Sequence, residues 1–266
     1  IASCNQLDDN EKVLGEASRS KKLQELFAPG RTYVQPDMRT ETWGRLREGK
    51  TAPARPGDPP PAAPRFRVAV IGASGGVGRH VVRLLLAQKH TVVALAREPA
   101  DVVPRSDRRL KKFKVDLAHC GPPDLARLIK RCHFVISCLG NRQGEDKVLK
   151  RGTGTLIEAM QMAGVGRMAM LSCVGVRDSD AQLRKQGWQG WVYSMLFSSV
   201  LGEEMQDLAA AEVICQAPRR GPEVASVVVR ASDLSDEKGH GKYCLASADG
   251  MVGGNVTRED VASFMV

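Results

Sequence analysis

The hydrophobic pattern of the chain changes at residue 65. From there on, short continuous apolar runs alternate with longer segments whose apolar residues recur at helical spacing. The apolar runs predict strands at 66–71, 91–96, 113–115, 134–139, 168–171 and 225–229. The amphipathic segments predict helices around 81–86, 125–131, 148–163 and 203–216. Continuously apolar strands are typical of sheets covered on both faces, so the pattern predicts an α/β domain with a doubly wound parallel sheet.

The first 64 residues have a different pattern. They hold eight of the fourteen prolines, and 53–64 reads PARPGDPPPAAP, a composition that favours polyproline II and disfavours helix or strand. Upstream, 8–27 is polar with a few apolar residues and predicts one amphipathic helix or two short ones. We therefore predict a mostly extended N-terminal arm with a proline-rich linker (1–64), followed by the α/β domain (65–266).

Two hypotheses fit this arm: a solvated extension, or a segment that wraps a partner and orders on binding. Phe27, Tyr33 and Trp43 are single aromatic residues among charges, and aromatic anchors dominate many interfaces. A second aromatic cluster within 188–197 fits either a cap over a substrate pocket or an apolar docking patch. Residues 1–64 and 188–197 are therefore the predicted contact segments for a protein partner.

Composition narrows the class of protein. With 266 residues and 42% hydrophobic residues, the chain is globular rather than collagen-like, disordered or a disulfide scaffold. No apolar run approaches the roughly 18 residues of a membrane-spanning helix. The net charge of +9 lies mostly in 65–266 and fits an anionic ligand such as a phosphorylated cofactor. RNA or an acidic protein would fit the same charge, although no RNA-binding motif is present.

The cysteines and the first residue bear on the compartment. Seven scattered cysteines without a CxxC pair are typical of reduced thiols in a core, which predicts a reducing compartment: the mitochondrial matrix, the plastid stroma or the cytoplasm. Because the chain begins with Ile1 rather than Met, we expect a processed product or a fragment. The five histidines have no metal-ligand spacing, so we expect no metal site.

The clearest chemical motif is a glycine-rich turn that follows the first predicted strand and opens the first helix. Its residues are Gly72, Ala73, Ser74, Gly75, Gly76, Val77 and Gly78. In G-x-x-G-x-x-G the first glycine permits a tight turn, the middle one lets backbone approach a pyrophosphate, and the last lets helix and strand pack closely. The helix N-terminus adds N–H groups and a positive dipole end. We predict dinucleotide binding here; the alternative is a tight turn that has lost its ligand.

Two polar residues follow the next two strands. An acid after the second strand would bind the ribose hydroxyls of NAD, whereas this chain has Arg97, which can pair with a 2′-phosphate. Arg97 therefore favours NADP(H) over NAD(H), with a surface arginine as the alternative. Asp116, after the third strand, fits two roles equally: capping a loop or contacting the adenine.

These features together resemble the atypical short-chain dehydrogenase/reductase group, above all the branch of biliverdin reductase B (flavin reductase) and related plant NADP-binding proteins. The resemblance covers about 66–266 and includes FVISCLGNRQGEDKVLKRGTGTLIEAMQMAGV, VGRMAMLSCVGV, VVVRASDLSDEKGHGKY and NVTREDVASFM. It implies a Rossmann-like fold. It also implies that Cys138, Leu139, Gly140 and Ser172 line the nucleotide cleft with the glycine turn, Arg97 and Asp116. Relatives usually continue past the position of Val266, so we expect a missing or trimmed C-terminal tail.

The catalytic residues depart from this group. Classical members use a Tyr-x-x-x-Lys pair, and here Phe197 stands where the lysine would follow Tyr193. Related members often carry a lysine two residues before a helical glutamate that corresponds to Glu212, and this chain has Ala210 there. Ser172 remains as the candidate catalytic residue, a hydroxyl that orients the substrate; the alternative is a plain strand-end serine. Cys173, with no base predicted beside it, is interpreted as a buried thiol.

Two functions follow from these observations. An NADP(H)-dependent reductase of flavins, quinones or similar planar acceptors needs little beyond the bound cofactor, which carries the chemistry. A catalytically degenerate accessory subunit of an organellar complex, such as a respiratory complex or ribosome docked through the arm, would keep the dinucleotide as a structural ligand. The intact turn and Arg97 favour the reductase, while the arm and the missing acid-base pair favour the subunit. An NADPH-reading redox sensor is a third hypothesis.

Overall fold

The computed structural model describes residues 2–3, 64–104, 106–140, 148–176, 202–218, 221–241, 243–244 and 255–266. The chain divides into two units, Ile1–Cys4 with Arg65–Val266, and Asn5–Pro64; the elements named below all belong to the first. The predicted helix at 8–27 and the linker lie outside the described residues, as does the aromatic segment 188–197. The predicted domain boundary at residue 64 stays a prediction.

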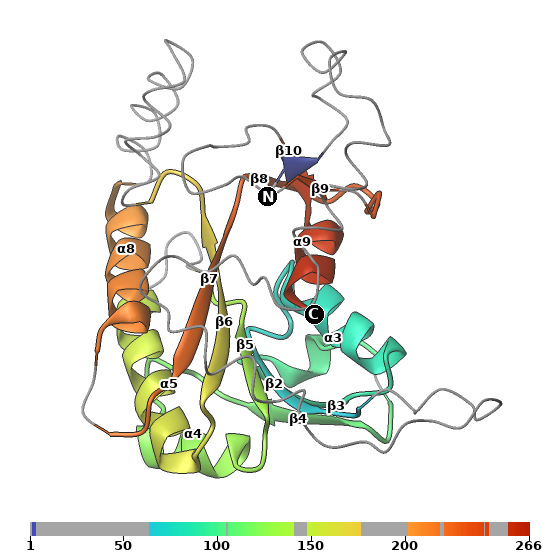
Figure 1. The fold of residues 1–266 in the computed structure, drawn as a ribbon. Coiled ribbons are helices and arrows are strands. Elements are labelled where there is room, and N and C mark those ends of the chain that lie inside the picture. Colours follow the sequence, from blue (N-terminus) through green and yellow to red (C-terminus); the bar gives the residue numbers. More distant parts are fainter. Residues whose placement is uncertain are drawn as a thin grey trace, which may run out of the picture. The chain divides into compact units, whose positions relative to one another are not determined.

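Six parallel strands form the central sheet (Figure 1). In spatial order they are β4 (Leu110–Lys114), β3 (Thr91–Ala96), β2 (Arg67–Ile71), β5 (Phe134–Ser137), β6 (Arg167–Cys173) and β7 (Ala225–Ala231). All neighbouring pairs are parallel. Because the strand order reverses between β2 and β5, this is the doubly wound, Rossmann-like arrangement, and the predicted fold class is confirmed.

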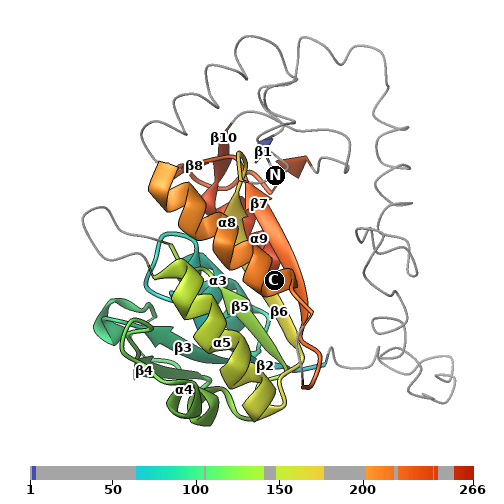
Figure 2. The ribbon, with the colours of Figure 1, turned by 90° about the vertical axis from the view of Figure 1, so that its left-hand side faces the viewer.

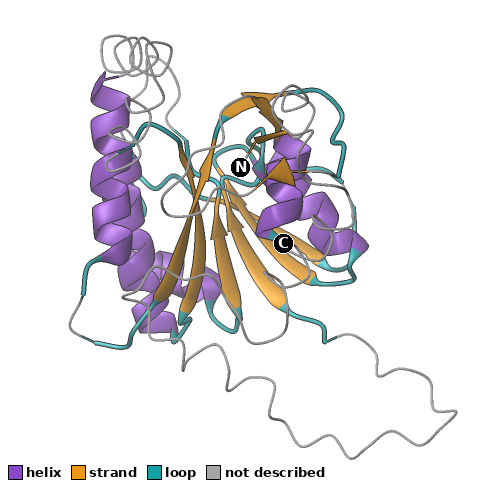
Figure 3. Ribbon diagram, turned by 45° about the horizontal axis from the view of Figure 1, so that its top comes forward, coloured by secondary structure: helices purple, strands orange, loops and turns teal. Residues whose placement is uncertain are grey.

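Helices cover both faces of the sheet (Figures 2 and 3). On one face lie α3 (Gly78–Ala87) and α9 (Arg258–Met265), and on the other lie α4 (Pro122–Ile129), α5 (Leu149–Ala163) and α8 (Gly202–Gln216). In β2, Val68 and Val70 enter the core under α3, whereas Ala69 and Ile71 enter the core under α4 and α5. Because side chains alternate along a strand, a strand with a core on each face is apolar throughout.

Shorter elements complete the described structure. The 3₁₀ helix η2 spans Pro99–Asp101, β8 (Asp233–Ser235) pairs in parallel with β10 (Asn255–Thr257), and β1 (Ala2–Ser3) pairs antiparallel with β9 (Tyr243–Cys244). Strand β10 leads directly into α9, whose N-cap hydroxyl, Thr257 Oγ1, accepts from the Asp260 amide at 3.0 Å. Among the described helices, none has the length and apolarity needed to cross a bilayer.

The strands and helices predicted from residue 65 on are all present, with shifts at their ends. Strand β3 has the predicted bounds, whereas β4 begins at Leu110 rather than at residue 113, because it is an edge strand that tolerates Lys111 and Lys112. Helix α4 begins at Pro122 rather than at residue 125, since a proline at the first helical position is already set at a helical φ.

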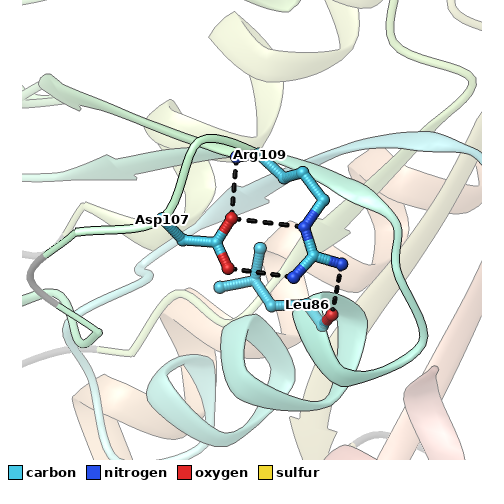
Figure 4. Close-up of polar contacts among 3 residues, drawn as sticks. All are labelled: Leu86, Asp107 and Arg109. Atoms are coloured by element: carbon cyan, nitrogen blue, oxygen red, sulfur yellow. Dashed lines mark hydrogen bonds and ion pairs between the residues drawn. The ribbon is translucent and has the colours of Figure 1, made fainter.

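Arg109 fixes the entry to β4 (Figure 4). Its Nε and Nη2 donate to the two carboxylate oxygens of Asp107 at 3.2 and 3.0 Å, and its Nη1 donates to the Leu86 carbonyl at 2.8 Å. These contacts join the start of β4 to the end of α3. Hydrogen bonds from the Arg109 side chain and amide lower the pKa of the Asp107 carboxyl.

Candidate functional site

The glycine-rich turn connects the end of β2 to the start of α3. Gly72 has φ of +72°, and a Cβ there would lie 2.6 Å from the carbonyl oxygen of Cys138. A Cβ at Gly78 would lie 2.1 Å from the carbonyl oxygen of Gly72. Backbone therefore approaches backbone at both positions too closely for any side chain. The amides of Gly72 and Ala73 anchor the turn by donating to the Leu95 carbonyl of β3, at 3.0 and 3.2 Å.

Several amides of this turn are available to a ligand. Within the part of the chain that the structure describes, the amides of Ser74, Gly76, Val77 and Gly78 donate no backbone hydrogen bond, whereas those of Gly75 and Arg79 do. Gly76 and Val77 come immediately before the first residue of α3. Amides at a helix N-terminus, together with the helix dipole, bind phosphate groups. The turn therefore fits the pyrophosphate of a dinucleotide.

Cys138 and Leu139 lie next to this turn, since a Cβ at Gly72 would be 2.6 Å from the Cys138 carbonyl oxygen and 3.4 Å from the Leu139 nitrogen. That Cys138, Leu139 and Gly140 line a nucleotide cleft stays a prediction. Strand β5 neighbours β2, and the Cys138 amide donates to the Ile71 carbonyl at 2.9 Å. This is the reversal point of the sheet, where doubly wound proteins bind ligands. Burial raises the pKa of the Cys138 thiol to about 12, so it packs as a neutral group.

Arg97 and Asp116 follow the ends of β3 and β4, on the other side of the turn. Arg97 is exposed. Asp116 accepts from the Ala118 amide at 3.0 Å and pairs with His119 Nδ1 at 3.0 Å, so its side chain caps the loop after β4. The hydrogen bond from Ala118, then His119 and more weakly the charge of Arg97, lower the Asp116 pKa. These contacts match the loop-capping alternative for Asp116; its contact with an adenine stays a prediction.

Ser172 belongs to a buried polar cluster at the ends of β6 and β7. Its Oγ donates to Glu212 Oε1 at 2.5 Å, and Glu212 is fully buried on α8. Arg230, on β7, donates from Nε to Glu212 Oε1 at 3.1 Å and from Nη2 to Oε2 at 2.7 Å. A carboxylate in a bidentate ion pair with a guanidinium stays ionised and is a strong hydrogen-bond acceptor. Since a serine has one hydroxyl proton, Ser172 in this arrangement can accept a hydrogen bond from a bound molecule but cannot donate one.

Cys173, next to this cluster, has the environment of an unreactive thiol. Burial, and next the negative charge of Glu212, raise its pKa to about 12, so it is protonated at neutral pH. Its Sγ lies 3.6 Å from Met205 Sδ. Cys120, Cys132, Cys138, Cys173 and Cys215 are free thiols, and Cys132, Cys138 and Cys215 are buried, as expected of small core residues.

No sequence pattern above assigned a role to Glu212 or Arg230. Glu212 entered only as the residue two positions after Ala210, and it is the residue that contacts Ser172. A single glutamate within LAAAEVIC and a single arginine at the end of ASVVVR are charges in apolar surroundings, and that pattern indicates a buried pair. Tyr193 and Phe197 lie outside the described residues. Across the described residues no group of His, Cys, Asp and Glu side chains could hold a metal ion.

Comparison with known proteins assigns the chain to a family. Residues 72–266 match the NAD(P)H-binding family, beginning at the first glycine of the turn, and the chain belongs to this family. Family and fold together bear out the predicted resemblance to the atypical short-chain dehydrogenase/reductase group, at the level of an NAD(P)-binding, Rossmann-like domain.

Solved structures share the fold. ChuY, an anaerobilin reductase from Escherichia coli O157:H7, has a TM-score of 0.60 and 23% identity, covering 74% of this chain and 87% of that one. A putative epimerase from Bacteroides thetaiotaomicron has a TM-score of 0.59 and 21% identity, covering 76% and 89%. At such identities the likeness concerns the fold alone.

The curated relatives match this chain over only part of their own length. Cinnamoyl-CoA reductase 1 of Oryza sativa subsp. japonica is 28% identical over 179 residues, which is 60% of this chain and 52% of that protein. The chain therefore matches about half the length of the rice enzyme. An uncharacterised chloroplastic protein of Arabidopsis thaliana is 26% identical over 208 residues, covering 75% of this chain and 70% of that protein.

Proposed function

We propose that this protein is an NADPH-dependent reductase of flavins, quinones or similar planar acceptors. Its family supports a nicotinamide dinucleotide as the cofactor. The observation that carries the choice of acceptor is the engagement of the Ser172 hydroxyl proton by the buried Glu212 carboxylate. Reduction of a carbonyl is assisted by a positioned acid, and this strand-end hydroxyl has no proton to give. Flavins and quinones accept hydride into a conjugated ring and can take their proton from water.

Each part of the site has a task in this proposal. When bound, NADPH would supply a hydride to the acceptor while water supplies the proton, giving NADP⁺ and the reduced acceptor. The amides of Gly76 and Val77 hold the pyrophosphate at the start of α3. Cys138–Gly140 form the neighbouring wall of the cleft. The Ser172 oxygen accepts from an N–H or O–H group and so orients an acceptor that carries one.

Arg97 supports the preference for NADPH over NADH. It is exposed directly after β3, where a 2′-phosphate would lie in this fold. Replacing it in Arg97→Gln removes the cation without reversing the charge. We expect NADPH to bind about tenfold more weakly and NADH with unchanged affinity, because charge-assisted phosphate contacts contribute on this scale. Equal weakening of both cofactors would contradict this role.

An acceptor panel tests the reductase proposal. Loss of NADPH absorbance is followed with FMN, a soluble quinone, an aromatic aldehyde and a cinnamoyl thioester. We expect turnover with FMN and the quinone only; preferential turnover of the aldehyde or the thioester would overturn the proposed acceptor class.

Ser172→Ala sharpens the same test. A hydroxyl that only orients the acceptor predicts a loss in kcat/KM below about tenfold, whereas loss of a general acid costs about 10²-fold or more. Ser226→Ala is the matched control, because Ser226 is also buried in the sheet and donates to the Cys215 carbonyl at 2.7 Å.

The second candidate is a cofactor-binding accessory subunit without turnover. The same cluster supports it, since a Ser172 held by Glu212 and Arg230 also suits a domain that has lost its proton donor. Tight NADPH binding without oxidation by any acceptor would favour this candidate. Protection of residues 1–64 from protease in cell extract, but not in the pure protein, would indicate a partner held by the arm.

We also propose an organellar location, in plastids or mitochondria. The reduced thiols in the core fit a reducing compartment, and the Arabidopsis relative is described as chloroplastic. Imaging of the full-length protein with a C-terminal fluorescent tag tests it: signal in an organelle supports the proposal, and diffuse cytoplasmic signal contradicts it.

A further inference from the structure

Arg258, the first residue of α9, lies against the glycine-rich turn. A Cβ built on Gly76 would be 2.6 Å from Arg258 Nε and 2.7 Å from its Cδ. The arginine side chain therefore fills the space that a side chain at position 76 would need. Helices α3 and α9 are neighbours on one face of the sheet (Figure 1). The guanidinium of Arg258, near the end of the chain, therefore reaches the glycine-rich turn that precedes α3.

Asp236 holds this guanidinium. Its Oδ2 accepts from Arg258 Nη1 at 2.9 Å, and its Oδ1 accepts from Arg79 Nη2 at 3.1 Å. Arg79 lies in the first turn of α3. One carboxylate is thus shared by two guanidinium groups, and it is the Arg258 group that lies against Gly76. A guanidinium beside the amides at a helix N-terminus is complementary to an anion.

The first turn of α9 also fixes the loop that carries Asp236. Glu259 Oε2 accepts from the Gly239 amide at 3.0 Å, and the two oxygens of Asp260 accept from the amides of His240 and Gly241 at 3.1 and 2.8 Å. Asp260 is 1% exposed. The loop is thus tied to α9 by the two residues that follow Arg258, and the guanidinium is oriented before any ligand binds. Such preorganisation lowers the cost of binding.

We propose that Arg258 binds the pyrophosphate of the dinucleotide and that Asp236 is its positioning residue. The guanidinium presents paired N–H groups to phosphate oxygens beside Gly76, where the turn amides meet the same group. The pyrophosphate is common to both nicotinamide cofactors, so Arg258 contributes equally to NADPH and NADH, in contrast to Arg97. The inference rests on dinucleotide binding and not on the identity of the hydride acceptor.

Fluorescence titration with NADPH and with NADH, without any acceptor, tests the proposal. In Arg258→Gln we expect the Kd of both cofactors to rise about tenfold with their ratio unchanged, the scale of a charge-assisted phosphate contact. Arg79→Gln is the matched control: it removes the other arginine of Asp236, its atoms are not among the three nearest to a Cβ at Gly76, and it should change both values less than about twofold. Unchanged affinity in Arg258→Gln, an effect on NADPH alone, or absence of binding by the wild type would overturn the inference.

A second substitution tests whether Arg258 acts through its contact with Gly76 rather than through the folding of the domain. Gly76→Ala would place a methyl group where Arg258 now lies and displace the guanidinium without removing its charge. We expect Gly76→Ala to weaken both cofactors in the wild-type background and to add little in Arg258→Gln, and Arg258→Lys to recover part of the affinity. Equal losses in both backgrounds would show that Arg258 does not act at the turn. Because the readout is a Kd, an inactive reductase with intact binding would contradict the proposed function and leave this inference standing.

Discussion

The two sides of the sheet's reversal point use different chemical groups: backbone amides on one side and buried side chains on the other. On the β2 side, the glycine-rich turn is one contiguous stretch of the chain. Its backbone amides are the groups offered to a ligand, and its glycines allow close contact between backbone segments. On the β6 side, Ser172, Glu212 and Arg230 come from two strands and a helix, and their working groups are a buried charge and its partners. The first region depends on the absence of side chains, and the second depends on every side chain being present.

This difference predicts how each region fails. Adding a carbon to the turn forces backbone apart, while the amides themselves cannot be deleted by substitution. Removing one member of the Glu212 cluster leaves the remaining charge without its partner in a site with little water, which costs more than the pair contributed. The substitutions below compare these two kinds of failure.

The largest effect is expected from Glu212→Gln. Glu212 is fully buried, and Arg230 has only 24% of its side chain exposed, so losing the carboxylate breaks a largely buried ion pair. We expect the free energy of unfolding to fall by about 3 kcal/mol, at the low end of values for breaking a buried pair. Urea unfolding measures it, with Glu158→Gln on the exposed face of α5 as a control expected within about 0.5 kcal/mol of wild type. Equal losses in the two variants would refute the buried charge pair.

Gly78→Ala is expected to come next. Its Cβ would lie 2.1 Å from the Gly72 carbonyl oxygen, a backbone atom that cannot rotate away. Overpacking of this kind costs about 2–3 kcal/mol, and here it should also weaken NADPH binding because the turn must open. Gly154→Ala in α5 is the control, since no atom lies within 4 Å of its Cβ, and it should stabilise the protein by about 0.5–1 kcal/mol. A stable Gly78→Ala with normal affinity would mean that the turn does not have this geometry.

Asp207→Ala probes a third long-range contact, with an intermediate effect. From α8, Asp207 accepts from the amides of Leu149 and Lys150 at 2.9 and 3.0 Å and so caps α5 from another helix. Loss of the cap should lower the free energy of unfolding by about 1–2 kcal/mol, measured in urea. Asp207→Asn keeps an acceptor oxygen and should lose less; if the two variants lose the same amount, the capping contact is not the cause.

The smallest effect belongs to the surface pair Asp107 and Arg109. The hydrogen bonds from Arg109 lower the Asp107 pKa below its ordinary value near 3.8. A lowered carboxyl pKa adds stability above the unfolded pKa and loses it as the pH falls through the folded pKa. The melting temperature of wild type should therefore exceed that of Asp107→Asn slightly at neutral pH, and the difference should shrink from about pH 5 to pH 3. A constant or growing difference on acidification would contradict this assignment.

The same contrast explains which features of the fold and the site could be predicted from the sequence. The turn could be predicted because its spacing, its strand and its helix are adjacent in the chain, and β3 was predicted with its observed bounds. The Ser172–Glu212 contact joins residues 40 positions apart, and no local pattern states which charges will meet when α8 packs on the sheet. Arg258 reaches Gly76 across an even longer separation, and only the packing of α9 beside α3 shows it.

Titration of the wild-type protein with NADPH and NADH tests most directly that the turn between β2 and α3 holds a dinucleotide. We expect saturable binding of both, with NADPH bound about tenfold more tightly because Arg97 adds a contact to its 2′-phosphate. Absence of binding by either cofactor at near-millimolar concentration would contradict dinucleotide binding at this turn, and the domain would then be a scaffold that keeps the fold of its family without its ligand.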